Sequence, residues 1–160
     1  MGSRLTTTDC AYIAGFLDGD GSLMFQLKRR KDSTRGWRFM VTICFYQDSR
    51  HETPLYWIRR KLGIGYLSRR NDGITEIRIN GYRQVKMILA RLLPFLKFKK
   101  LQATTIYRAC ELLARKKVVT LTKPDREFLL RCLVSVQKHN YASRSKKSLS
   151  ELRKVVGLTP

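Results

Sequence analysis

The sequence has few of the side chains that bind soft metals or form disulfide networks. It contains only two histidines, His51 and His139, and its four cysteines include no Cys-x-x-Cys pair. This scarcity argues against a zinc finger or a zinc site built from histidine and cysteine. Because the cysteines are widely spaced, we interpret them as reduced structural thiols of an intracellular protein rather than a disulfide framework. They are Cys10, Cys44, Cys110 and Cys132.

Long apolar runs are also missing. No stretch approaches the roughly 20 apolar residues that a membrane-spanning helix needs. No basic segment followed by an apolar one opens the chain, and residues 1–3 are compatible with an expression scar. We therefore expect a protein without a membrane partner that is not secreted and works in a prokaryotic cytoplasm or an organelle.

Acidic residues are scarce as well. The 160 residues include 12 Asp and Glu against 33 Lys and Arg, a formal net charge of +21. Such an excess indicates a polyanionic partner, either nucleic acid or, less well supported, an anionic membrane surface. The length and the 43% hydrophobic content suit one domain over residues 1–160 with a real core. No segment indicates a small-molecule organic cofactor.

The segment from Tyr12 to Gly21 organises our interpretation of the rest. Ile13, Phe16 and Leu17 have the spacing of one apolar helical face. Small residues occupy the other side and would let two helix backbones approach closely. The contact between two copies is expected to involve Ala11, Ala14, Gly15 and Asp18.

Two carboxylates come at the end of this predicted helix. We expect the helix to stop at Gly19 and Gly21, because glycine allows a chain to leave a helix through positive φ. The helix dipole disfavours Asp18 and Asp20 there, so their placement predicts a compensating cation such as a divalent metal. The alternative is a simple polar turn, since Asp and Gly are common turn residues.

The remaining pattern predicts an α+β fold. Alternating residues indicate strands at Ser22 to Lys31 and Trp37 to Gln47, a helix at His51 to Leu62, and strands at Gly65 to Arg70 and Ile74 to Asn80. Helices are predicted at Tyr82 to Leu92, Lys99 to Arg115 and after Thr122, with a short last helix that Ser148 and Glu151 begin. The C-terminal helical region thus starts at about residue 122. We expect a four-stranded antiparallel saddle sheet with helices on one face.

The open face of this sheet would carry cations mixed with hydrogen-bonding and apolar side chains. That mixture is suited to base edges in the major groove of DNA, whereas a purely electrostatic binder would not need it. The alternative is a solvated strand face. The outward residues are Met24, Gln26, Lys28, Arg30, Arg38, Met40, Thr42, Ser68, Arg70, Glu76 and Arg78.

The sequence Ile13-Ala14-Gly15-Phe16-Leu17-Asp18-Gly19-Asp20-Gly21 resembles the LAGLIDADG motif of homing endonucleases, in the branch with one motif per chain that works as a homodimer. The resemblance extends through the α-β-β-α-β-β-α order, Gly63-Ile64-Gly65-Tyr66, the run from Pro94 to Lys99 and the C-terminal helices.

The resemblance implies roles for individual residues. Asp20 would be the catalytic, metal-binding carboxylate, with the Gly19 carbonyl as a nearby ligand; Mg²⁺ is expected, and Mn²⁺ or Ca²⁺ would fit the same site. Gln47 would order water near the metal, unless it merely ends a strand. Lys99 would stabilise charge on the phosphate, with Lys97 as its rival in a basic run. The arginine that relatives often carry near residue 51 is replaced here by His51.

The C-terminal region would contact the DNA backbone, or would alternatively be only a basic surface loop. The residues concerned are Ser143, Arg144, Lys147 and Ser148. The resemblance as a whole implies a metal-dependent, site-specific double-strand DNA endonuclease that is encoded in an intron, in the family's manner, and reads a long pseudo-palindromic site as a homodimer. The alternatives are a non-catalytic binder on the same scaffold, either an RNA maturase or a DNA-binding regulator, and a basic ribosomal protein.

Overall fold

The computed structural model describes residues 4–32, 35–140 and 146–158. Within them the predicted α-β-β-α-β-β-α order is confirmed. One antiparallel sheet has the strand order β1-β2-β4-β3, and its strands are β1 (Gly21–Arg29), β2 (Trp37–Asp48), β3 (Tyr66–Arg69) and β4 (Ile74–Asn80). The helices are α1 (Thr7–Asp20), α2 (Thr53–Leu62), α3 (Tyr82–Leu92), α4 (Lys100–Arg115), α5 (Lys123–His139) and α6 (Leu149–Val155), with short 3-10 helices η1 (Ser49–His51) and η2 (Val118–Thr120).

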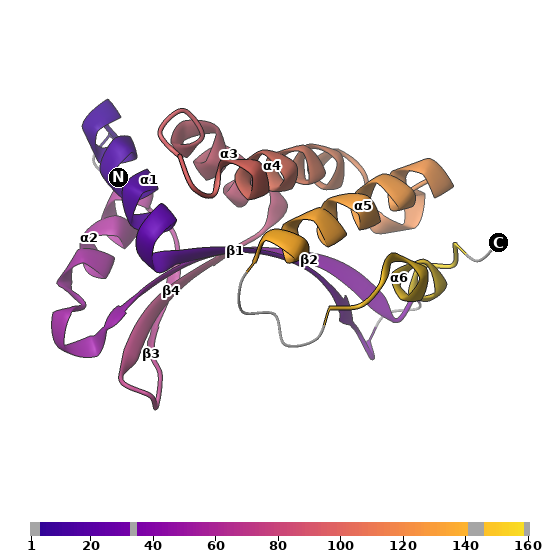
Figure 1. The fold of residues 1–160 in the computed structure, drawn as a ribbon, viewed down its shortest axis with the longest axis horizontal. Coiled ribbons are helices and arrows are strands. Elements are labelled where there is room, and N and C mark those ends of the chain that lie inside the picture. Colours follow the sequence, from indigo (N-terminus) through magenta and orange to yellow (C-terminus); the bar gives the residue numbers. More distant parts are fainter. Residues whose placement is uncertain (1–3, 33–34, 141–145, 159–160) are drawn as a thin grey trace.

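The sheet is arched, and α1, α3, α4 and α5 lie together on one side of it (Figure 1). The core fills the space between these helices and the inner strand faces, where Phe25, Phe39 and Phe45 are at most 1% exposed. The lower side of the arch in Figure 1 carries no such layer over β3 and β4. The predicted fold class, α+β with helices on one face of a four-stranded sheet, is therefore confirmed.

A capping box at Thr6 fixes the start of helix α1. Thr6 and Asp9 form a reciprocal capping box, in which the Asp9 amide donates to the Thr6 hydroxyl at 3.1 Å and the Thr6 amide donates to the Asp9 carboxylate at 3.0 Å. These bonds satisfy amides that the first turn of a helix leaves without partners.

The predicted stop of this helix at Gly21 is confirmed, but the predicted stop at Gly19 and the predicted positive φ were wrong. Helix α1 continues through Gly19 to Asp20, and Gly21 has an extended backbone with φ −126° rather than a positive φ. Glycine is nevertheless needed at position 21, because a Cβ there would lie 2.6 Å from Leu17 Cδ1 and 2.9 Å from the carbonyl oxygen of Cys44. The requirement is close packing between α1 and β2, not left-handed backbone geometry.

The other boundaries differ only at element ends. The bounds predicted for β4 and α3 are confirmed, as is the helix start at Thr122, where a capping box with Asp125 begins α5. The predicted helix from residue 51 is divided, because residues 49–51 form η1 and α2 starts at Thr53 with Pro54 in its first turn. Proline is tolerated there because the first turn leaves its amide positions unpaired.

Candidate active site and nucleic-acid interface

The junction between α1 and β1 presents the main predicted carboxylate to solvent. Asp20 and Gly19 are both exposed. The Asp20 side chain makes no hydrogen bond or ion pair with any residue in the described part of the chain. A carboxylate with free oxygens is the kind of ligand that hard divalent cations prefer. The carboxylate oxygens of Asp20 are thus accessible for metal coordination.

Asp18, two residues earlier, has the opposite environment. Its carboxylate accepts hydrogen bonds from the backbone amides of Lys97, Phe98 and Lys99 at 2.8, 3.1 and 2.9 Å. Burial acts to raise the pKa of Asp18, but these three amides outweigh it and hold the pKa below the ordinary value. The expected need for a cation is therefore met at Asp18 by backbone amides.

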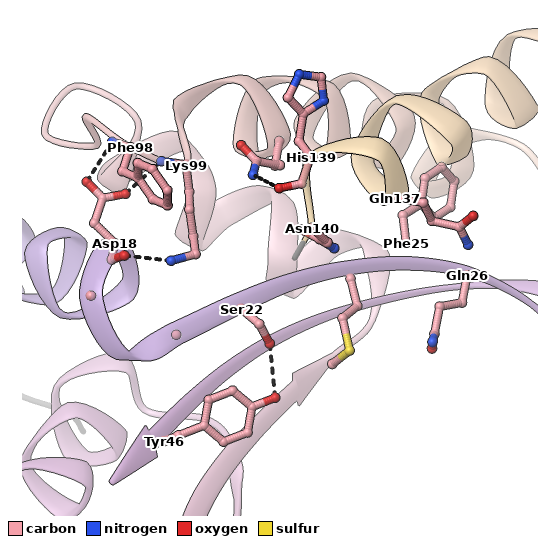
Figure 2. Close-up of a pocket in the computed structure, with 14 residues that line it drawn as sticks. Asp18, Ser22, Phe25, Gln26, Tyr46, Phe98, Lys99, Gln137, His139 and Asn140 are labelled. Atoms are coloured by element: carbon pink, nitrogen blue, oxygen red, sulfur yellow. Dashed lines mark hydrogen bonds between the residues drawn. The ribbon is translucent and has the colours of Figure 1, made fainter. Parts of the chain in front are cut away.

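Lys99 is the basic side chain that the fold brings to this junction. Its ammonium group donates to the backbone carbonyl of Asp18 at 2.6 Å and lies 5.3 Å from the centre of the Phe98 ring (Figure 2). Burial lowers the pKa of Lys99, while the charges of Asp18 and Asp20 oppose that shift. Its rival Lys97 is exposed and uses its backbone amide instead.

Gln47 lies close to the same junction through the strand register. Gly21 at the start of β1 pairs with Phe45, and Gln47 comes two residues further along β2, where it pairs with Thr75 of β4. Its side-chain oxygen accepts the Asp48 amide at 2.9 Å, which leaves its NH₂ group as a donor. His51 is exposed in η1, and the adjacent Arg50 is held by Asp48 at 2.7 Å.

A groove of about 580 Å³ runs from the end of α1 along the edge of β1 to the end of α5. On the sheet side Tyr46 and Ser22 share a hydrogen bond of 3.0 Å between their hydroxyls, and burial raises the pKa of Tyr46 to about 12. On the helix side, where Figure 2 shows Asn140 at the end of α5, the Asn140 side-chain NH₂ group donates to the Leu23 carbonyl at 2.8 Å.

Sequence reasoning missed several residues that line this groove. Gln137, His139 and Asn140 come from the end of α5. The side-chain oxygen of Gln137 is buried without a hydrogen-bond partner in the described residues. Only the packing of α5 against β1 creates this wall, and no local pattern around these residues could have indicated it.

The outer sheet face carries most of the predicted DNA-binding residues. Lys28 lies directly opposite Arg38 on the neighbouring strand, an arrangement in which like charges repel. Of the remaining set, Arg30, Arg70 and Arg78 are exposed, and the half-buried members are Met24, Gln26, Met40 and Ser68. Repelling cations on an open face favour an anionic partner.

Two predicted members of this face are not exposed. Thr42 is 2% exposed, and its hydroxyl donates to the Asn80 side chain at 2.7 Å. Glu76 is 5% exposed, accepts from Arg78 Nε at 2.6 Å and lies 3.8 Å from Arg70 Nη1. The prediction that both side chains are exposed was wrong, because Asn80 packs against Thr42 while Arg78 and Arg70 pack against Glu76. Among the described residues Arg78 is bonded through Nε alone, so its two terminal NH₂ groups can serve as the donor fork that meets guanine.

The C-terminal predictions fall partly outside the described residues, where Ser143 and Arg144 lie. Lys147 is exposed. Ser148 begins α6, and its hydroxyl accepts the Glu151 amide at 3.2 Å.

The predicted contact face of α1 is partly exposed. Ala11 and Gly15 are exposed, and a Cβ added at Gly15 would meet no atom within 4 Å. Ala14 is 0% exposed within the single chain, so its assignment to the outer face was wrong. Asp18 lies beside this face with its carboxylate already bonded to the 97–99 backbone.

None of the helices among the described residues is long and apolar enough to span a bilayer. Residues 13–108 match the family model described as LAGLIDADG endonuclease. DNA endonuclease I-CvuI of Chlorella vulgaris is 31% identical over 107 residues, which are 67% of this chain and 66% of that protein. DNA endonuclease I-CreI of Chlamydomonas reinhardtii is 26% identical over 117 residues, 73% of this chain and 71% of that protein.

The fold also matches a solved structure. Homing endonuclease I-CvuI in complex with the I-CreI target in the presence of Mg superimposes with a TM-score of 0.78 at 24% identity, over 94% of this chain and 93% of that one. The motif at the end of α1, the sheet topology and the family match all point to the same family. The chain belongs to the LAGLIDADG endonuclease family.

Proposed function

We propose that this protein is a site-specific double-strand DNA endonuclease that hydrolyses phosphodiester bonds as a homodimer. The observation that carries the proposal is Asp20 at the α1–β1 junction, which is exposed and has no bonded partner among the described residues. It lies near Lys99 and directly before a cation-bearing strand. A binder of DNA alone would gain nothing from a free carboxylate that faces phosphate, because like charges repel.

The donor set at this junction suits magnesium. Asp20 and the Gly19 carbonyl would hold the ion with hard oxygen atoms. Among the described residues no three His, Cys, Asp or Glu side chains gather into a metal site, so one chain offers only part of a ligand set. A second copy would supply the rest. When bound, Mg²⁺ polarises the scissile phosphate and lowers the pKa of a coordinated water.

The neighbouring side chains have complementary roles. The Lys99 ammonium would stabilise negative charge that develops on the phosphate. The free NH₂ group of Gln47 would orient water through a hydrogen bond. Lys99 is bonded to the last turn of α1, and Gln47 lies next to the end of β2; both would act on the same phosphate as Asp20.

Homodimerisation follows from the exposed part of α1. Gly15 and Gly19 have no atom within 4 Å of an added Cβ, so another backbone could approach them closely. Two such helices in contact would bring the two Asp20 side chains to the centre of the combined surface.

Each copy would then read one half of a pseudo-palindromic site. The nine residues of β1 span about 30 Å at about 3.3 Å per residue, roughly nine base pairs at about 3.4 Å per step. Intron homing is the biological process we assign to this cleavage, and a prokaryotic cytoplasm or an organelle is the compartment we assign to the protein.

The test begins with selection of cleavage sites from a randomised duplex library in the presence of Mg²⁺. The wild-type protein should linearise a plasmid that carries a selected site, and chelation of the metal should stop cutting. Asp20→Asn should abolish cleavage and leave DNA affinity within about twofold, since it removes a metal ligand but no reading side chain. Cutting that persists in Asp20→Asn would refute the assigned mechanism.

A further inference from the structure

We propose that Asp18 is a positioning residue of the cleavage reaction, which fixes Lys99 beside Asp20 through the backbone of residues 97–99. The inference rests on the proposed function, since it concerns how one of its residues is placed. It assigns to Asp18 neither metal binding nor DNA contact. The two elements that it connects lie 79 to 81 residues apart in the sequence.

Both oxygens of the Asp18 carboxylate take part. Oδ2 accepts the amides of Lys97 and Phe98 at 2.8 and 3.1 Å, and Oδ1 accepts the amide of Lys99 at 2.9 Å. Lys99 is the N-cap residue directly before α4, and its own side chain makes no capping bond. Asp18 therefore supplies, from the end of α1, acceptors for the amides that lead into another helix.

Helix electrostatics favour this arrangement. A carboxylate is destabilised at the C-terminal end of its own helix and stabilised at the N-terminal end of another. Asp18 lies in the last turn of α1 but faces the start of α4, so the second effect offsets the first. Asp20, at the same end of α1, has no such partner among the described residues.

The contact is reciprocal. While the Asp18 carboxylate holds the Lys99 backbone, the Lys99 ammonium donates to the Asp18 backbone carbonyl at 2.6 Å (Figure 2). A lysine side chain has four rotatable methylene bonds and loses entropy when it is ordered. Because one residue fixes both ends of Lys99, the ammonium is placed next to the junction before any phosphate arrives.

The experiment combines four variants of the full chain with a duplex selected by cleavage. Asp18→Asn keeps the side-chain volume but removes the charge and one acceptor oxygen. Lys99→Met removes the ammonium, and the double variant combines both changes. The matched control is Asp9→Asn, the same chemical change on the same helix, where the carboxylate accepts from Thr6 and Lys61 instead.

In single-turnover assays Asp18→Asn should slow cleavage by about 10- to 100-fold, the usual effect of losing a residue that orients a reacting group. Affinity for the duplex and the Mg²⁺ concentration for half-maximal rate should each stay within about twofold. In the Lys99→Met background the same substitution should add less than about twofold. Asp9→Asn should cleave like the wild type at temperatures where it is folded.

Amide hydrogen exchange of the free protein gives a second readout. Exchange at residues 97–99 should speed up in Asp18→Asn and stay unchanged in Asp9→Asn. The inference is overturned if these amides keep their protection, if Asp18→Asn slows cleavage equally with and without Lys99, or if it raises the Mg²⁺ requirement. Failure of the proposed function differs from all three, because the wild-type protein would then not cut any selected duplex.

Discussion

The substitution Gly15→Ala should affect the single chain and the dimer in opposite directions. Gly15 lies within α1, and an added Cβ would meet no atom within 4 Å. In the folded monomer alanine should therefore raise the unfolding free energy by about 0.8–1.0 kcal/mol, the difference in helix propensity. If two α1 helices touch at Gly15, the same methyl group must fit between two backbones.

The cost in the dimer can be worked out from overpacking. One added methyl in a tight contact costs about 1–3 kcal/mol, and the two copies together about 2–6 kcal/mol. The helix-propensity gain is present in both monomer and dimer, so it cancels in the dissociation constant. A loss of about 2 kcal/mol of dimer stability raises the dissociation constant by about 30-fold, which favours monomers.

Sedimentation equilibrium over a concentration series measures the dissociation constant of wild type and Gly15→Ala. Chemical denaturation at a concentration where both are monomeric measures the change in the single chain. A dimer that dissociates as the wild type does, alongside a stabilised monomer, would show that the exposed part of α1 is not the contact. The reasoning about two Asp20 side chains meeting at the centre would then fail.

Three further predictions concern single sites. Gly21→Ala should lower the unfolding free energy by about 1–3 kcal/mol, because its Cβ would clash with Leu17; a thermal melt should show a fall of about 2–12 °C, and an unchanged melt would contradict the packing argument. Bonds from Arg69 and Thr75 lower the pKa of Glu52 from 4.5 to about 2. Ionised Glu52 therefore stabilises the fold fully above about pH 4.5, and this contribution is lost as the pH falls toward 2. In Glu52→Gln the unfolding free energy, measured by urea denaturation, should fall less over that pH range. Lys28→Gln should relieve repulsion from Arg38 and stabilise the free protein by about 0.2–1 kcal/mol, while it weakens DNA binding and reduces the salt slope by about 1; an unchanged slope would remove Lys28 from the interface.

Local patterns predicted the elements well where one periodicity dominates. Alternation over Ile74–Asn80 and helical spacing over Tyr82–Leu92 gave the bounds that the structure has, because both segments pack one face on the core. The capping residue Thr122 was likewise readable, since its partner Asp125 is three residues away. Patterns formed by residues a few positions apart can be interpreted from the sequence, because the tertiary structure does not change which residues interact.

Features that depend on distant segments were not readable in this way. Gly21 is required by Cys44 on the neighbouring strand, and the partners of Asp18 lie beside another helix. The position of Ala14 in the core rather than on the outer face follows from how α1 is rotated against the sheet, which a run of small residues does not fix. The family resemblance indicated Asp20 and Lys99, whereas the surroundings of each became visible only in three dimensions.

The shared carboxylate of Glu76 has a consequence for changing the target of such a protein. Both Arg78 and Arg70 interact with this carboxylate. Arg78 Nε donates to it at 2.6 Å, and Arg70 Nη1 lies 3.8 Å from it. Replacing either arginine changes the electrostatic potential and the packing around the other. The base preferences of the two positions would therefore be coupled. Libraries that vary these positions one at a time would sample mostly unbalanced charges, and retargeting would succeed when all three residues are randomised as a block.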